Sequence, residues 1–77
     1  MLIEAAKELL ENNYRITYNS DLKIAASKKI DGFTEIRVAY NGDRWCGSGI
    51  LPNGNLVRVD DAPSLDSVVR RLLALTP

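Results

Sequence analysis

Hydrophobic residues recur at helical spacing near both ends of the chain. At the start they occupy positions 2, 5, 6, 9 and 10, and charged residues fill the opposite side, so residues 2–11 are predicted to form an amphipathic helix. Asn12 and Asn13 would end this helix, because asparagine tolerates the left-handed backbone of a helix C-cap. A second helix is predicted after Ser64, whose hydroxyl can cap the first amides, with a buried stripe at positions 65, 68, 69, 72 and 73.

Between the helices the hydrophobic period changes to two, which is typical of strands. Residues 14–19, 22–27 and 36–41 alternate between apolar and polar side chains, and Asn, Asp, Ser or Gly bound each run. Two more strands are predicted on either side of the Pro52-Asn53-Gly54 turn. The segment 20–30 also fits a capped helix with residues 22, 25, 26 and 30 on one side, but we prefer the strand interpretation.

The turns predict which side chains share one face of the sheet. Asn41-Gly42 suits a two-residue turn, while Pro52-Asn53-Gly54 and the segments 19–21 and 30–32 suit three-residue loops. The predicted opposite pairs are Val38 with Trp45, Gly49 with Val57, Gly47 with Val59, Tyr18 with Leu22, and Ala26 with Ile36. One face then collects the apolar side chains Tyr14, Tyr18, Leu22, Ile24, Ile36, Val38, Tyr40, Trp45, Leu51, Val57 and Val59.

These elements predict an α+β fold with an N-terminal helix, a five-stranded antiparallel meander and a C-terminal helix. Both helices would cover the apolar face of the sheet. A chain of 77 residues is expected to form a single domain, residues 1–77. Because so small a core supplies only ~3–5 kcal/mol of net stability, a homodimer or a bound partner would stabilise it further.

The composition argues against most kinds of catalytic site and metal site. The chain has one cysteine and no histidine, so it lacks the usual general base, and we expect no metal site, no catalytic residue and no cofactor. Its apolar runs are too short to span a membrane, and its start lacks the basic residues of a secretory signal. We therefore expect a cytoplasmic protein that is not an enzyme.

The segment 44–51 holds the chain's only cysteine and tryptophan, and it is the one stretch that resembles reactive chemistry. In the predicted register Trp45 points into the core, and Gly47 and Gly49 leave room there for the indole or a helix. Cys46 points to the opposite face, where no histidine can activate it as a nucleophile. The segment 47–49 lies within a strand and lacks the lysine of a phosphate loop. Asp60-Asp61 is expected to help start the second helix.

The face without helices is predicted to be basic and floored by small side chains. Against Glu35 and Asp60 it carries six cations, which are Arg15, Lys23, Lys29, Arg37, Arg44 and Arg58. Between them stand Thr17, Ala25, Ser27, Ala39, Cys46 and Ser48. Such a flat surface can closely approach an acidic protein or a phosphate backbone. Antiparallel sheets also commonly keep one polar, solvated face, so solvent exposure alone remains an alternative.

We therefore expect a non-catalytic binding module, a regulator or inhibitor of phage or toxin–antitoxin type that docks on a larger protein or protein–nucleic-acid complex. The six cations are the expected partner-binding residues. Direct nucleic-acid binding through this basic face is the alternative. The strand–strand–strand–helix order of residues 33–74 is similar to that of domains that read DNA with a small sheet, such as the plant ethylene-response and integrase arm-binding domains, although no diagnostic motif is shared. The zero net charge favours a protein partner, because DNA-binding domains are usually basic.

Overall fold

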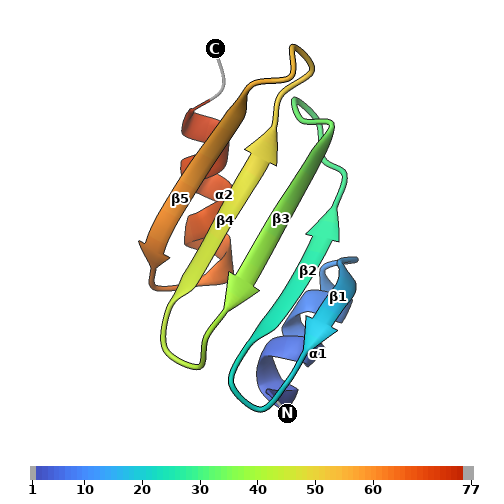
Figure 1. Cartoon of the computed structure of the whole chain (residues 1–77), viewed down its shortest axis with the longest axis vertical. Coiled ribbons are helices and arrows are strands. Elements are labelled where there is room, and N and C mark those ends of the chain that lie inside the picture. Colours follow the sequence, from blue (N-terminus) through green and yellow to red (C-terminus); the bar gives the residue numbers. More distant parts are fainter. Residues whose placement is uncertain (1, 76–77) are drawn as a thin grey trace.

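The computed structural model describes residues 2–75 and places two helices on a five-stranded sheet (Figure 1). In chain order the elements are α1 (Ile3–Glu11), β1 (Arg15–Asn19), β2 (Ile24–Lys28), β3 (Glu35–Tyr40), β4 (Trp45–Ile50), β5 (Leu56–Ala62) and α2 (Leu65–Ala74). The strands pair antiparallel in sequence order, so the sheet is a meander. The predicted α+β fold is confirmed, and so is the strand interpretation of the segment 20–30.

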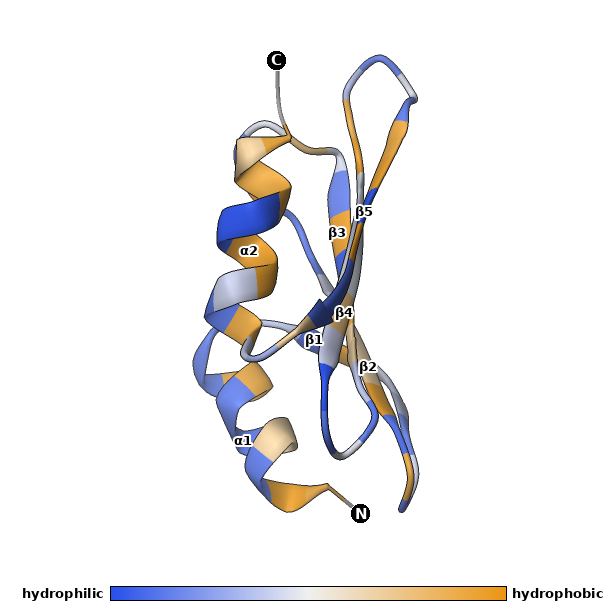
Figure 2. Ribbon diagram, turned by 90° about the vertical axis from the view of Figure 1, so that its left-hand side faces the viewer, coloured by the Kyte–Doolittle hydropathy of each residue, from blue (hydrophilic) through white to orange (hydrophobic). Residues whose placement is uncertain are grey.

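Both helices lie on the same side of the sheet (Figure 2). Helix α1 packs on β1 and β2, whereas α2 packs on β4 and β5. The other side of the sheet, which faces the viewer in Figure 1, is covered by no described element, and we call it the open face. This two-layer arrangement directs alternate side chains of the strands to the core or to solvent, and buried side chains occur in β2 to β5 but not in β1.

The hydrophobic core fills the space between the helices and the sheet. Its most completely buried large side chains are Leu9, Ile24, Ile36, Val38, Val68 and Leu72. Phe33, from the connection between β2 and β3, is also buried, although the alternation of apolar residues did not include it. Leu10 and Leu73, which were predicted to be buried, are exposed because each helix touches the sheet through a narrower stripe than the sequence suggested.

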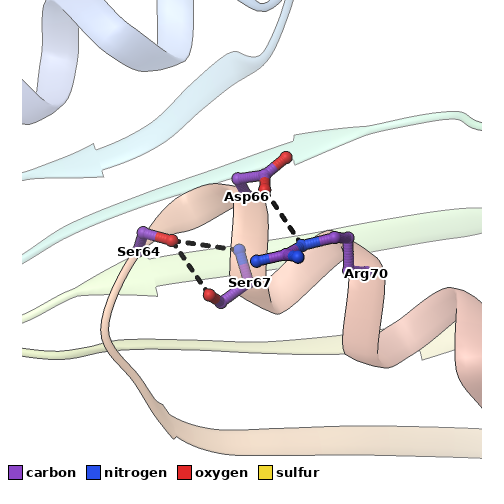
Figure 3. A network of polar contacts seen from close by, with 4 residues as sticks. All are labelled: Ser64, Asp66, Ser67 and Arg70. Carbon is purple, nitrogen blue, oxygen red and sulfur yellow. Dashed lines mark hydrogen bonds and ion pairs between the residues drawn. The ribbon is translucent and has the colours of Figure 1, made fainter.

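Local hydrogen bonds end α1 and begin α2 as the sequence predicts. Asn13 has a φ of 66°, and the amide of Tyr14 reaches back to the carbonyl of Leu9 at 2.9 Å, which closes α1 with a Schellman-type turn. At the start of α2, Ser64 Oγ accepts a hydrogen bond from the amide of Ser67 at 3.1 Å (Figure 3). Backbone groups at the C-terminal end of α1 and the N-terminal end of α2 therefore have hydrogen-bond partners within the chain.

The observed registers of the β2–β3 and β3–β4 pairs differ from the predicted ones by two residues, and the predicted register of the β4–β5 pair is confirmed. Gly49 pairs with Val57 and Gly47 with Val59 as predicted, whereas Val38 pairs with Gly47 and Ala26 with Val38. The β3–β4 turn has four residues because Asn41 Oδ1 accepts hydrogen bonds from the amides of residues 43 and 44 at 3.0 and 2.8 Å. The β2–β3 connection is longer because it places Phe33 in the core. An even slip keeps every side chain on its predicted face.

The β1–β2 hairpin departs further from the prediction. Ile16 pairs with Ala26, but Tyr18 pairs with Ala25, so β1 carries a bulge between the two pairs. The bulge moves Tyr18 from the predicted core face to the open face, where it is 56% exposed. Leu22 lies in the connecting loop rather than in a strand and is 80% exposed. The predictions that Tyr18 and Leu22 pair and lie in the core were therefore wrong.

A second bulge lies in β5, where Asp60 and Asp61 together oppose Cys46. Val59 pairs with Gly47 and Ala62 with Trp45, which leaves one extra residue in β5, and Asp61 has a φ of 55°. The two aspartates are thus strand residues, and the expectation that they help start α2 was wrong. Because bulges disrupt ladder pairing, the two outer strands are poor templates for unwanted strand addition.

Candidate functional site

A row of alternating arginine and serine crosses the whole open face. Arg15 pairs with Ser27, Ser27 with Arg37, Arg37 with Ser48, and Ser48 with Arg58. Directly paired residues point to the same side of a sheet, so these five side chains form one line perpendicular to the strands. The three arginines are exposed and the two serines are half-buried. We call this line the arginine ladder, meaning Arg15, Arg37 and Arg58 with Ser27 and Ser48 between them.

The ladder borders a trough of small side chains. In the neighbouring row, Tyr18 pairs with Ala25, Ala25 with Ala39, and Ala39 with Cys46. Between this row and the ladder lies a shallow hollow of about 260 Å³, whose lining includes Ala25, Ala39, Cys46, Arg37 and Arg58. We call the row from Ala25 through Ala39 to Cys46 the trough. A partner can approach the backbone of the sheet closely there, because no long side chain stands in the way.

The other three predicted cations lie around the ladder rather than on it. Lys23 and Lys29 are exposed and lie just outside the two ends of β2. Arg44 is the last residue of the β3–β4 turn, and its guanidinium donates a hydrogen bond to the carbonyl of Asp61. The structure therefore gathers Arg15, Arg37 and Arg58 into one line and leaves Lys23, Lys29 and Arg44 separate from it.

Two carboxylates lie on the same face and engage two of the arginines. Arg37 Nη2 lies 3.4 Å from Glu35 Oε2, and Arg58 Nε lies 3.0 Å from Asp60 Oδ1. Both pairs join residues two apart in one strand, and the arginine side chains are about 70% exposed (68% and 73%). Exposed ion pairs of this kind contribute ~0–1 kcal/mol, so an incoming anion can replace them at little cost.

The opposite side of the molecule carries an acidic hollow beside α1. Glu4, Glu8 and Glu11 line it with one cation, Lys7, and with the ring pair of Tyr40 and Trp45, whose centroids are 4.7 Å apart. The hollow has a volume of about 370 Å³ and is open to solvent. The molecule is thus polarised, with acids along one helix and arginines on the open face, although its formal net charge is zero.

The described residues bring together no set of groups that suggests catalysis. Within residues 2–75, no three His, Cys, Asp or Glu side chains gather closely enough to hold a metal ion. Cys46 is half-buried beside Ala39, and the charged residues that line the same surface hollow are Lys23, Arg44, Asp60 and Asp61. No helix in this part of the chain is long and apolar enough to cross a membrane.

Tyr18 is the open-face residue that the sequence pattern missed. Strict alternation over residues 14–19 assigned all the tyrosines of this segment to one side, but the bulge at Thr17 moves Tyr18 to the other side, opposite Ala25. The run Tyr14-Arg15-Ile16-Thr17-Tyr18 contains no glycine or proline to signal the bulge. The exposed aromatic ring therefore becomes evident only once the pairing with β2 is known.

Glycines at two buried positions of β4 bring the layers close together. A Cβ atom on Gly47 would lie 2.5 Å from Val68 Cγ1 of α2, and one on Gly49 would lie 2.5 Å from Phe33 Cε1. The prediction that glycine makes room for a helix is confirmed at Gly47, whereas Gly49 makes room for Phe33 rather than for the indole. These close approaches set the distance of β4 from α2 and Phe33, and β4 carries the Cys46 and Ser48 side chains of the open face.

Comparisons with protein-family models, with curated proteins and with solved structures gave no significant match for this chain.

Proposed function

We propose that the chain is a non-catalytic binding module whose open face docks on an acidic surface of a larger protein, as a regulator or inhibitor would. The arginine ladder is the observation that carries this proposal. Arginine is enriched in the centres of protein interfaces and lysine is depleted there, and the ladder holds three arginines while Lys23 and Lys29 lie outside it. Exposed Leu56, 65% accessible, adds an apolar contact at the start of β5, two residues before Arg58.

The shape of the molecule also favours docking through this face. Its Cα extents are 36 × 21 × 17 Å, and the open face is one of its two broad sides (Figure 1). A standard protein interface buries about 800 Å² on each partner, and the broad sides offer the largest continuous area for it. The carboxylates of Glu35 and Asp60 on this face would repel a uniform phosphate backbone, whereas an acidic protein surface can place neutral side chains opposite them.

Capture experiments with two charge-matched variants test the proposal. Arg37→Glu with Arg58→Glu reverses two ladder charges, and Arg70→Glu with Arg71→Glu reverses two charges on α2. Immobilised wild type and the α2 variant should retain the same stoichiometric protein from nuclease-treated lysate, and the ladder variant should lose it, because like charges at an interface cost several kcal/mol. Circular dichroism and thermal melting should show that both variants fold. Equal capture by the ladder variant would mean that the open face is not the site.

Tyr18 supports a second candidate function, the binding of single-stranded nucleic acid. Its exposed ring lies on the open face, one row from Arg15, and aromatic rings flanked by cations stack on bases. Under this function, oligonucleotide binding should weaken with salt and with Tyr18→Ala. Glu4→Lys with Glu8→Lys on α1 should preserve or strengthen it by adding positive charge. Loss of the captured partner after nuclease treatment would favour this candidate over the first.

A further inference from the structure

We propose that the arginine ladder receives an acidic α-helix of the partner protein, laid across the strands with carboxylates seven residues apart. This inference rests on the proposed function and specifies the shape of the partner surface. It follows from the regular spacing of the ladder, from the trough beside it and from the way in which its guanidinium groups are held.

The spacing of the ladder matches two turns of an α-helix. Neighbouring strands lie about 4.8 Å apart, so Arg15 and Arg37, and likewise Arg37 and Arg58, are separated by about 9.6 Å. In an α-helix, residues i and i+7 lie about 10.5 Å apart along the axis and on nearly the same side. The difference of about 1 Å per step is well within the reach of flexible arginine side chains.

Other regular chains fit this spacing less well. In an extended strand, side chains on one side repeat about every 6.7 Å, which falls between the arginines. Along one strand of duplex DNA, three steps rise about 10.2 Å, but a turn of about ten base pairs rotates the third phosphate by roughly 100° away from the sheet. Of the α-helix, the extended strand and the DNA strand, only the α-helix places charged groups in a nearly straight line at the spacing of the arginines.

The trough supplies a place for the body of such a helix. Ala25, Ala39 and Cys46 run parallel to the ladder and leave the hollow of about 260 Å³ above the sheet. Tyr18 stands at the β1 end of the same row and can contact an apolar helix side chain. A helix seated there would present small or apolar residues to the trough and carboxylates to the ladder, and it would therefore be amphipathic.

Two of the three guanidinium groups of the ladder are already held along the open face. Glu35 and Asp60 hold Arg37 and Arg58 by single exposed contacts of 3.4 and 3.0 Å. A partner carboxylate can form two parallel hydrogen bonds with one guanidinium, which is a stronger arrangement than either intrastrand contact. Ser48 lies between these two arginines and offers a hydroxyl to the same carboxylate.

Synthetic helical peptides test the inference directly. Two peptides of equal length, composition and net charge are compared, one with glutamates at i, i+7 and i+14 and one with them at i, i+5 and i+10. The first should bind the intact chain about tenfold more tightly, since one well-placed charged contact is worth about that factor. Arg37→Ala should abolish this preference and Arg71→Ala should retain it. Ala39→Phe, which fills the trough, should weaken the first peptide selectively.

The possible outcomes separate this inference from the proposed function. Equal binding of both peptides would refute the inference of a helical partner segment but would not contradict the proposed docking on an acidic protein. Binding of an oligonucleotide in preference to both peptides would overturn both proposals. The chain's own α1 carries Glu4 and Glu11 seven residues apart. Self-association could be lost both in the Arg37→Glu variant and in the double variant Glu4→Lys with Glu11→Lys. That result would mean that a second copy of the chain binds the ladder, and it would overturn the inference of a separate partner.

Discussion

The ring of Phe33 lies directly over Gly49 in the buried layer of the sheet. An added Cβ on Gly49 would approach Phe33 Cε1 to 2.5 Å and Cδ1 to 2.6 Å, distances that real Cβ atoms essentially never show. Phe33 belongs to the β2–β3 connection and Gly49 to β4, so this contact joins segments on either side of β3. It explains why the connection after β2 is longer than the predicted three-residue loop.

Gly49→Ala should therefore destabilise the fold, although alanine is otherwise better than glycine within a strand. Forcing one methyl group into a packed core costs about 1–3 kcal/mol, which exceeds the ~0.5–1 kcal/mol gained by replacing a flexible glycine. Urea unfolding followed by tryptophan fluorescence gives the change in the free energy of unfolding.

The smaller side chain of Phe33→Leu provides the control for this prediction. Because leucine leaves room for the added methyl group, the double variant should be more stable than the sum of the two single changes implies, with a coupling of about 0.5–3 kcal/mol. If the two changes are simply additive, the ring and Gly49 do not limit each other as the structure indicates.

Trp45→Ala should unfold much of the protein at room temperature. Trp45 is only 5% exposed, packs against Tyr40, and pairs with Ala62 next to the β5 bulge. Removing a buried indole typically costs about 3–5 kcal/mol, which is comparable to the whole stability expected for so small a core. Circular dichroism and a thermal melt measure the loss. A melting temperature within a few degrees of wild type would mean that Trp45 contributes to a surface rather than to the core.

The fold should lose stability in alkaline solution through Tyr14. Burial, and to a smaller extent the carboxylate of Glu8, raises the pKa of Tyr14 above its ordinary value of 10.0. The folded state thus favours the neutral phenol, so this contribution is fully present below about pH 10 and is lost as the pH rises through the folded pKa. The free energy of unfolding should fall more steeply above about pH 10 in wild type than in Tyr14→Phe. Identical slopes for wild type and Tyr14→Phe would refute the assignment.

Much of the fold could be predicted because local pattern and burial agree. The helical periods near both ends, the capping by Ser64 and the three-residue loop at Pro52-Asn53-Gly54 all depend on neighbours in sequence. The wrong registers at the β2–β3 and β3–β4 hairpins slipped by two residues, so the faces of β3 and β4 were still correct. The placement of six cations outside the core could therefore be predicted without the structure.

The ladder and the exposed ring could not be predicted, because both depend on which residues lie opposite each other. Arg37 lies between Ser27 and Ser48 only when the two central registers have their observed values, and the predicted turn lengths place other residues there. Tyr18 reaches the open face through a bulge that no glycine or proline signals. Turn length and bulges are set by packing between distant segments, as the Phe33 contact with Gly49 illustrates.

Cys46 should react with a thiol reagent in the native protein. Its side chain is half-buried in the trough of the open face, beside Ala39, and it is the chain's only cysteine, so modification should reach one equivalent. Mass spectrometry of the native protein, with a denatured sample as reference, measures both the rate and the final stoichiometry. Modification should be slower than in the denatured chain, because neighbouring side chains restrict access to a half-buried sulfur.

The same cysteine reports on whether the trough is occupied. Saturating amounts of the helical peptide with glutamates at i, i+7 and i+14 should slow the modification of Cys46, because a helix seated over Ala25 and Ala39 covers the sulfur. The out-of-register peptide should leave the rate unchanged, which controls for non-specific contact. Protection in the absence of any peptide, relieved only by denaturant, would mean that another copy of the chain already covers the open face. Dilution then gives the deciding measurement, because protection by a second copy weakens as the protein concentration falls.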